Sequence, residues 1–179
     1  MRLYPCPAPG LLSSMLKCIC KEVVTVDFAE DLKPDIVSDI KSIPLKDSAF
    51  DVVCSFQVLE HIPWCEVPNA LREMTRLSRK HVLFSVPDNN MMRTSVVFVR
   101  FTLLNQSIGY SQTRKIYNGV SNPKEHYWEI VVNGASTEAI EEIISRAGMT
   151  LMNCWLDGVD RYFLCKVSGV AGNFPDRLN

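Results

Sequence analysis

Short apolar runs alternate with stretches of helical periodicity along this chain. Apolar runs of strand length occupy residues 23–27, 36–39, 51–55 and 81–86. Apolar residues at three- and four-residue spacing predict helices over residues 11–20, 67–77 and 138–147. Strands that alternate with helices favour a parallel sheet covered on both faces. We therefore predict an α/β fold, a doubly wound and mostly parallel sheet, formed by residues 1–179 as one domain.

The C-terminal third adds two further signals. Residues 149–155 and 161–167 predict two strands joined by Asp157-Gly158, a hairpin that contributes an antiparallel edge strand. Ser136 or Thr137 is suited to cap the helix over 138–147, and Gly148 is suited to end it.

The segment 91–132 follows no clear period. It mixes apolar residues with basic ones, which are Arg93, Arg100, Arg114 and Lys115. These cations could bind an anionic group of a ligand, but a solvated basic face is the favoured interpretation. We treat the segment as an insert within the domain.

Composition and charge limit the possible partners. The 179 residues carry a formal net charge of −1, so no strong global field attracts nucleic acid or a membrane surface. Nucleic-acid binding is therefore not expected. No run approaches the roughly 18 apolar residues of a transmembrane helix, so stable membrane insertion is not expected either. The seven cysteines form no Cys-x-x-Cys pair, which favours reduced thiols in a cytoplasmic protein. Cys18 and Cys20 lack a second ligand pair, so no metal site is expected.

Polar residues follow several of the predicted strands. Asp27, Asp39 and Ser55 each stand where an apolar run ends. In an open α/β sheet, ligands bind at the carboxyl ends of the strands, and the pattern therefore predicts a nucleotide-type crevice there.

Four pieces, in the right order and spacing, then resemble one known family. They are Asp27, Asp39-Ile40, Pro44-Leu45 followed by Phe50-Asp51-Val52-Val53, and the segment 57–61 with its Leu-Glu-His turn. Together they resemble the class I S-adenosylmethionine-dependent methyltransferases of the small-molecule type, with a Rossmann-like fold. The resemblance covers residues 10–88 and 137–167. It implies methyl transfer from S-adenosylmethionine to a small-molecule acceptor by in-line displacement.

The resemblance also implies a set of cofactor-binding residues. They are Gly10, Asp27, Phe28, Asp39, Ile40, Ser55, Phe56, Gln57 and His61. Asp27 would bind the ribose hydroxyls, because a carboxylate accepts two hydrogen bonds. Asp39 and Ile40 would contact the adenine. The alternatives are a loop-capping role for Asp27, a turn or cap role for Asp39, and ordinary strand termination for the residues that follow the fourth strand.

Two histidine-containing segments carry the remaining chemistry. His61 is the candidate general base, but methyl transfer needs mainly alignment, so a loop-ordering or cofactor-contacting role is favoured. His126, Tyr127 and Trp128 would form an aromatic wall for the acceptor, within a substrate-side insert or lid over 91–132. His126 or Glu129 is an alternative base. Local packing of this cluster is the other interpretation.

One feature departs from the family pattern. The Gly-rich loop that precedes the first helix is reduced to Gly10, and Pro5, Pro7 and Pro9 stand where the first strand belongs. Proline removes a ladder donor, so the first strand is expected to be absent. The alternatives are therefore a non-catalytic methyltransferase-like binding module or a truncated, inactive relative. A nicotinamide-dependent oxidoreductase is disfavoured, since no Gly-x-Gly-x-x-Gly occurs.

Overall fold

A seven-stranded sheet organises the molecule in the computed structural model. The model describes residues 2–3, 11–89, 92–101, 106–115, 122 and 124–168. The strand order is β3-β2-β1-β4-β5-β9-β8. The strands are β1 (Arg2–Leu3), β2 (Thr25–Asp27), β3 (Ile36–Val37), β4 (Phe50–Phe56), β5 (Ser78–Pro87), β8 (Met149–Asp157) and β9 (Asp160–Val167). The α/β prediction is confirmed.

The predicted C-terminal hairpin is present and contributes an antiparallel edge strand, as expected. β9 is the antiparallel strand, and it lies inside the sheet between β5 and β8, so β8 forms the edge. Phe163 and Cys165 of β9 are fully buried, whereas Trp155 and Leu156 of β8 are 37% and 46% exposed. β9, the more buried of the two strands, takes the interior position, where both of its edges are paired.

The expectation that the first strand is absent is wrong. Arg2 pairs with Thr25 and Cys54, so the two-residue β1 joins β2 to β4 in parallel register. The physical reason is that the prolines begin only at Pro5, and Arg2 and Leu3 keep the backbone N–H groups that a central strand needs. Gly10, the expected cofactor-loop glycine, lies outside the described residues.

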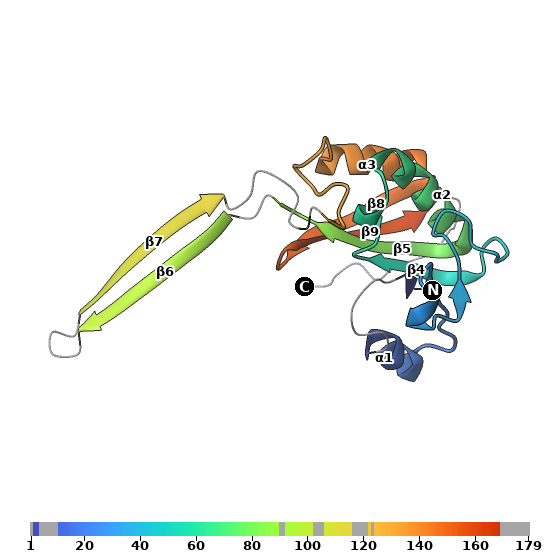
Figure 1. The fold of residues 1–179 in the computed structure, drawn as a ribbon, viewed down its shortest axis with the longest axis horizontal. Helices are drawn as coiled ribbons and strands as arrows, with labels where there is room; N and C mark the ends of the chain where they lie inside the picture. Colours follow the sequence, from blue (N-terminus) through green and yellow to red (C-terminus); the bar gives the residue numbers. More distant parts are fainter. Residues whose placement is uncertain are drawn as a thin grey trace.

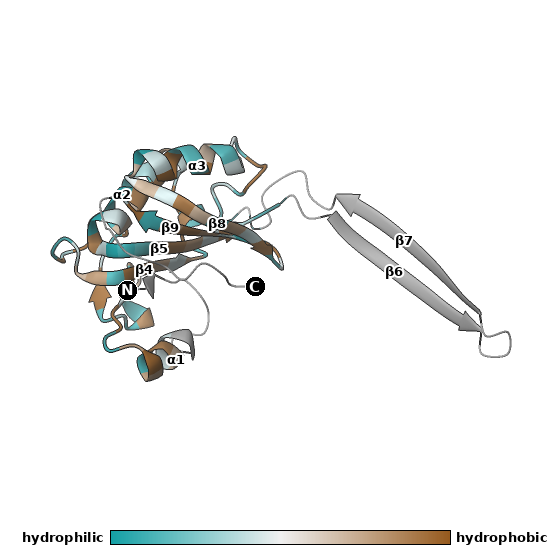
Figure 2. Cartoon of the chain, turned by 180° about the vertical axis from the view of Figure 1, so that it is seen from behind, coloured by the Kyte–Doolittle hydropathy of each residue, from teal (hydrophilic) through white to brown (hydrophobic). Residues whose placement is uncertain are grey.

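Helices cover both faces of the sheet, as expected. α2 (Val67–Leu77) and α3 (Thr137–Arg146) lie on one face, and α1 (Leu11–Ile19) lies on the other (Figure 1). Three single 3-10 turns complete the described helices: η1 (Glu30–Leu32), η2 (Leu59–His61) and η3 (Trp64–Glu66). Hydrophilic and hydrophobic residues alternate along α2 and α3 (Figure 2), which is the pattern of helices with one buried face.

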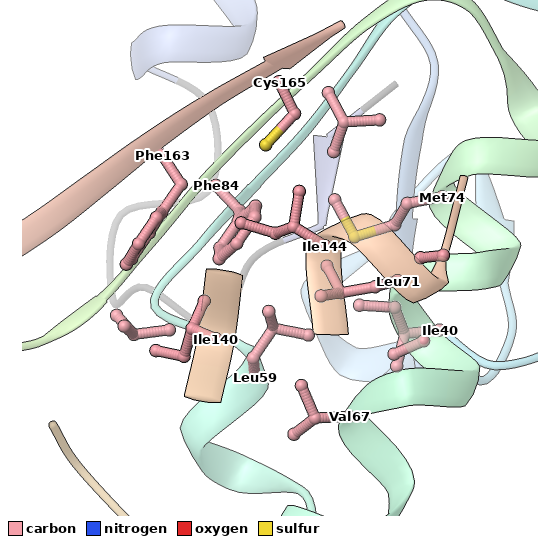
Figure 3. Packing of buried hydrophobic residues seen from close by; sticks show 14 of the residues in the cluster. Ile40, Leu59, Val67, Leu71, Met74, Phe84, Ile140, Ile144, Phe163 and Cys165 are labelled. Carbon is pink, nitrogen blue, oxygen red and sulfur yellow. The ribbon is translucent and has the colours of Figure 1, made fainter. Parts of the chain in front are cut away.

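The main core lies between the sheet and the pair α2–α3. The rings of Phe84 and Phe163 stack with centroids 4.9 Å apart on neighbouring strands. Side chains from both helices close over them (Figure 3): Leu71, Met74, Ile140 and Ile144. Full burial stabilises each such side chain by about 1.5–3 kcal/mol, so this layer fixes the sheet and the loops at its carboxyl end.

The insert is more regular than its sequence suggested. β6 (Met92–Phe101) and β7 (Gln106–Lys115) pair antiparallel in continuous register and form a two-stranded sheet of their own (Figure 1). The segment 96–99 is rich in valine and phenylalanine, which favour strands. The role of the insert as a lid stays a prediction. Within the described part of the chain, no helix is long and apolar enough to cross a membrane.

Candidate active site

Asp27 ends β2 at the carboxyl edge of the sheet, as the sequence predicts. It is only 7% exposed, and its Oδ1 accepts a hydrogen bond from the Ala29 N–H at 2.9 Å. Burial raises the pKa of Asp27 above its usual value, although the Ala29 N–H opposes this effect. Phe28, the next residue, is 73% exposed and presents its ring at the same edge. The structure therefore combines a partly desolvated carboxylate with an exposed aromatic ring.

Asp39 and Ile40 follow β3, one strand farther along the sheet. Asp39 is exposed, and its Oδ1 accepts a hydrogen bond from the Lys41 N–H at 2.9 Å, which is the turn geometry considered as its alternative role. Ile40 is 6% exposed and belongs to the hydrophobic core (Figure 3).

The end of β4 supplies the next polar groups. Ser55 is fully buried, and its hydroxyl has no hydrogen-bond partner among the described residues. Gln57 adopts a left-handed conformation (φ 54°) that turns the chain out of the strand. Its side-chain amide donates to Asp160 Oδ1 at 2.8 Å, and burial raises the pKa of that aspartate. The Phe56 ring lies 6.1 Å from the ring of Tyr162.

The Leu-Glu-His turn, η2, comes next and places Glu60 in an unusual setting. The Glu60 side chain is fully buried, and neither carboxylate oxygen has a hydrogen-bond partner within the described chain. Burial raises its pKa to about 8, and the nearby acids Asp160 and Glu129 contribute in the same direction. A buried acid with a strongly shifted pKa is a frequent mark of a functional site.

The segment 126–129 docks onto this turn. The Tyr127 N–H donates to the Glu60 carbonyl at 2.8 Å. The Trp128 indole N–H lies 3.1 Å from each of the carbonyls of Leu59 and Ile62. Trp128 is 1% exposed and meets Trp64 edge to face, so its contacts are those of the packing interpretation. Tyr127 is 58% exposed and is the aromatic residue of this segment that faces solvent.

This docking brings the two candidate bases together. The rings of His61 and His126 meet edge to face, with centroids 4.9 Å apart. His61 Nδ1 lies 3.0 Å from the Glu125 carbonyl, and His126 Nδ1 lies 2.7 Å from Glu129 Oε1. A carbonyl only accepts, and an ionised carboxylate also only accepts, so each Nδ1 carries a proton, and in a neutral ring the lone pair then lies on Nε2. Burial lowers the pKa of His61, which favours this neutral form.

The structure thus brings His61 and His126 together, whereas Asp39 lies in an exposed turn and Ile40 lies in the hydrophobic core. Asp27 ends β2 and Ser55 lies one residue before the end of β4, on the two neighbours of β1. His61 contacts the His126 ring, and Tyr127 contacts the turn that carries His61. Sequence reasoning missed the buried state of Glu60 and the partnership of Gln57 with Asp160. The three-residue spacing of His126 and Glu129 was a visible signal for their contact.

Comparisons with known proteins bear on the fold that carries these residues. Residues 6–86 match a family model described as a methyltransferase domain. No curated protein matches the chain in sequence. Among solved structures, an S-adenosylmethionine-dependent methyltransferase from Clostridium acetobutylicum is similar, with 11% identity and a TM-score of 0.61. That match covers 94% of this chain and 83% of the other.

A second solved structure adds a ligand-bound example. It is a 1,6-didemethyltoxoflavin-N1-methyltransferase from Burkholderia thailandensis, with bound 1,6-didemethyltoxoflavin and S-adenosylhomocysteine. The identity is 10%, the TM-score is 0.60, and the match covers 93% of this chain and 70% of the other. The resemblance to class I S-adenosylmethionine-dependent methyltransferases that the sequence predicts is therefore confirmed, by the family model over residues 6–86 and by the fold as a whole.

Proposed function

We propose that this chain transfers a methyl group from S-adenosylmethionine to a small-molecule acceptor. The observation that carries the proposal is the position of Asp27, a buried carboxylate at the end of β2, in a methyltransferase fold whose sequence matches a methyltransferase model. The ligands bound to the Burkholderia enzyme support the choice of cofactor and of acceptor class.

The residues present fit this cofactor. Asp27 would accept hydrogen bonds from the ribose hydroxyls, and the exposed Phe28 ring offers an apolar surface beside it. The Ser55 hydroxyl, buried and without a partner among the described groups, is a polar atom that a ligand at the end of β4 would satisfy. The cofactor would supply a methyl group already activated by the sulfonium.

The protein's own contribution would then be binding and alignment. In-line displacement requires the nucleophile, the methyl carbon and the sulfur to be held in a row, and positioning of this kind accounts for much of the barrier reduction. The turn that carries His61, together with Tyr127, would form the acceptor side of the proposed active site. His61, held neutral by burial, is the group suited to accept a proton from the acceptor.

Calorimetric titration with S-adenosylhomocysteine tests the proposal directly. We expect micromolar binding with one site per chain. Binding followed by methylation of some member of an acceptor panel supports an enzyme. Binding without turnover favours the non-catalytic module, and no binding by a protein with an intact circular dichroism spectrum contradicts the proposal.

A further inference from the structure

Three potential ligand groups converge beside the turn after β4. A carboxylate oxygen of Glu60 and one ring nitrogen each of His61 and His126 all lie within 4.8 Å of one another. The nearest measured pair is His61 Nε2 and Glu60 Oε1, at 3.8 Å. Neither histidine is fully buried, with 22% and 11% of the side chains exposed, so the cluster is reached from solvent through the imidazole rings.

Glu60 gives the cluster its unusual character. Its side chain is completely buried, and no side chain of the described residues donates a hydrogen bond to either oxygen, although the backbone N–H of Glu60 itself favours the charged form. Most buried carboxylates in proteins are paired or bound to a metal, because an uncompensated charge is costly to bury. In the neutral form of each imidazole, Nε2 carries a lone pair, so the histidines add two further acceptors beside the carboxylate. Three groups with lone pairs that face one another are satisfied either by a proton held between them or by a metal cation.

The groups behind the histidines fit a metal site. His126 Nδ1 donates to Glu129, which is 1% exposed, and Glu129 Oε2 in turn accepts from the Asn89 side chain at 3.0 Å. His61 Nδ1 donates to the backbone carbonyl of Glu125. Metal-binding histidines nearly always donate their second ring N–H to a carboxylate or a carbonyl, which fixes the tautomer and the ring orientation.

We propose that Glu60, His61 and His126 bind a divalent transition metal ion of the zinc class. Two imidazoles and one carboxylate form a ligand set that suits such an ion and leaves a coordination position open. Ligand bonds of about 2.0–2.1 Å place tetrahedral ligand atoms about 3.4 Å apart, so the widest pair must approach by somewhat more than 1 Å on binding. Rotations of the three side chains supply a movement of that size.

A proton shared between Glu60 and His61 is the competing occupant. It would satisfy the same lone pairs without any metal. The two occupants differ in a measurable way, because only the metal site binds zinc with a stoichiometry of one and loses that binding when Glu60 or His126 is replaced.

The test uses the full chain without a polyhistidine tag, treated with a chelator and then titrated with Zn²⁺ by calorimetry. We expect one ion per chain with micromolar or tighter affinity. Glu60→Gln, which preserves the shape of the side chain, and His126→Ala should each weaken binding at least tenfold. Glu129→Gln, which alters the support of His126 and the contact with Asn89 but no proposed ligand, should weaken it by about 10–100-fold.

Matched controls separate this site from other metal-binding groups. His81→Gln removes the remaining histidine of the chain, and Cys18→Ser with Cys20→Ser removes the two exposed cysteines of α1 and its C-terminus. Neither control should change the affinity. Co²⁺ substitution should give visible bands without the sulfur charge-transfer absorption that thiolate ligands produce.

Two outcomes would overturn the proposal. One is the absence of a one-to-one zinc complex, and the other is zinc binding that survives Glu60→Gln, His61→Ala and His126→Ala in variants that keep the native circular dichroism spectrum. The titration contains no S-adenosylmethionine, so its result is separate from cofactor binding and alignment in the proposed methyl transfer. A metal ion on His61 Nε2 would exclude only the role of His61 as proton acceptor.

Discussion

His126 and Glu129 are joined by a 2.7 Å contact between Nδ1 and Oε1, and both are nearly removed from solvent. The pair orients the imidazole of His126 toward His61, and the backbone between them docks on the turn after β4. The segment that precedes α3 therefore packs against the turn after β4, which belongs to the first half of the chain. The acceptor side of the proposed active site depends on this docking.

Asp27→Asn should separate cofactor binding from stability. Hydrogen bonds to a charged group contribute about 1.5–3 kcal/mol, so the affinity for S-adenosylhomocysteine should fall about 10–100-fold. Burial raises the pKa of Asp27, and an acid with a raised native pKa costs stability as pH rises above 3.8. The variant without ligand should therefore unfold at an equal or higher urea concentration at pH 7.

Asp31→Asn is the matched control for that change. Asp31 is an exposed carboxylate in η1, a few residues beyond Asp27. Its replacement should leave cofactor affinity within about twofold, because surface substitutions seldom exceed 0.5 kcal/mol. Equal affinity of Asp27→Asn and the wild type in calorimetry would remove Asp27 from the cofactor site.

Trp128→Phe should weaken the docking of its segment. The substitution removes the indole N–H that the carbonyls of Leu59 and Ile62 share, and it leaves space in the core. We expect a loss of about 2 kcal/mol in the free energy of unfolding, measured by urea denaturation. Trp155→Phe on β8 is the control, since Trp155 is 37% exposed and should cost much less. Equal losses for the two variants would contradict the assigned role.

Ser136→Ala should shorten or destabilise α3. The Ser136 side chain accepts a hydrogen bond from the Ala139 N–H at 3.1 Å and caps the helix. Loss of an N-cap costs about 1 kcal/mol. Ser145→Ala, at an exposed position near the end of the same helix, should be neutral or slightly stabilising because alanine is the better helix former. Thermal unfolding followed by circular dichroism compares the two.

Cys165 should behave as a buried thiol. It is fully buried in β9, and burial raises its pKa to about 12. Between pH 9 and 12 the unfolded chain releases this proton and the native state keeps it, so Cys165 lowers stability by about 1.4 kcal/mol per pH unit. Cys165→Ala should flatten that part of the stability profile.

Alkylation in the native state checks the same burial independently. The exposed cysteines Cys18, Cys20 and Cys65 should react with iodoacetamide near neutral pH, and Cys165 should react only after unfolding. Peptide mass spectrometry reports each site. Native-state labelling of Cys165 at the rate of Cys65 would show that β9 is not held inside the sheet.

Local patterns determine much of this protein. Apolar spacing predicts α2 to its observed bounds, and the cap and glycine signals around α3 correspond to a Ser136 cap and to Gly148 in the left-handed conformation (φ 83°). These features depend on residues close in sequence, where helical periodicity and backbone preference act directly. The motif order from Asp27 to His61 was likewise sufficient to identify the methyltransferase fold.

Long-range packing decides the remainder. No local signal shows that β9 rather than β8 pairs with β5, because that choice compares the total burial of two apolar strands. The same holds for Glu60. In the sequence it has the features of an ordinary turn residue, and it becomes buried only when the segment 126–129 and the sheet enclose it. The sequence by itself determined the elements, their order and the family resemblance. Only the tertiary structure decided which polar groups share a desolvated site, because burial and proximity arise when distant segments pack together.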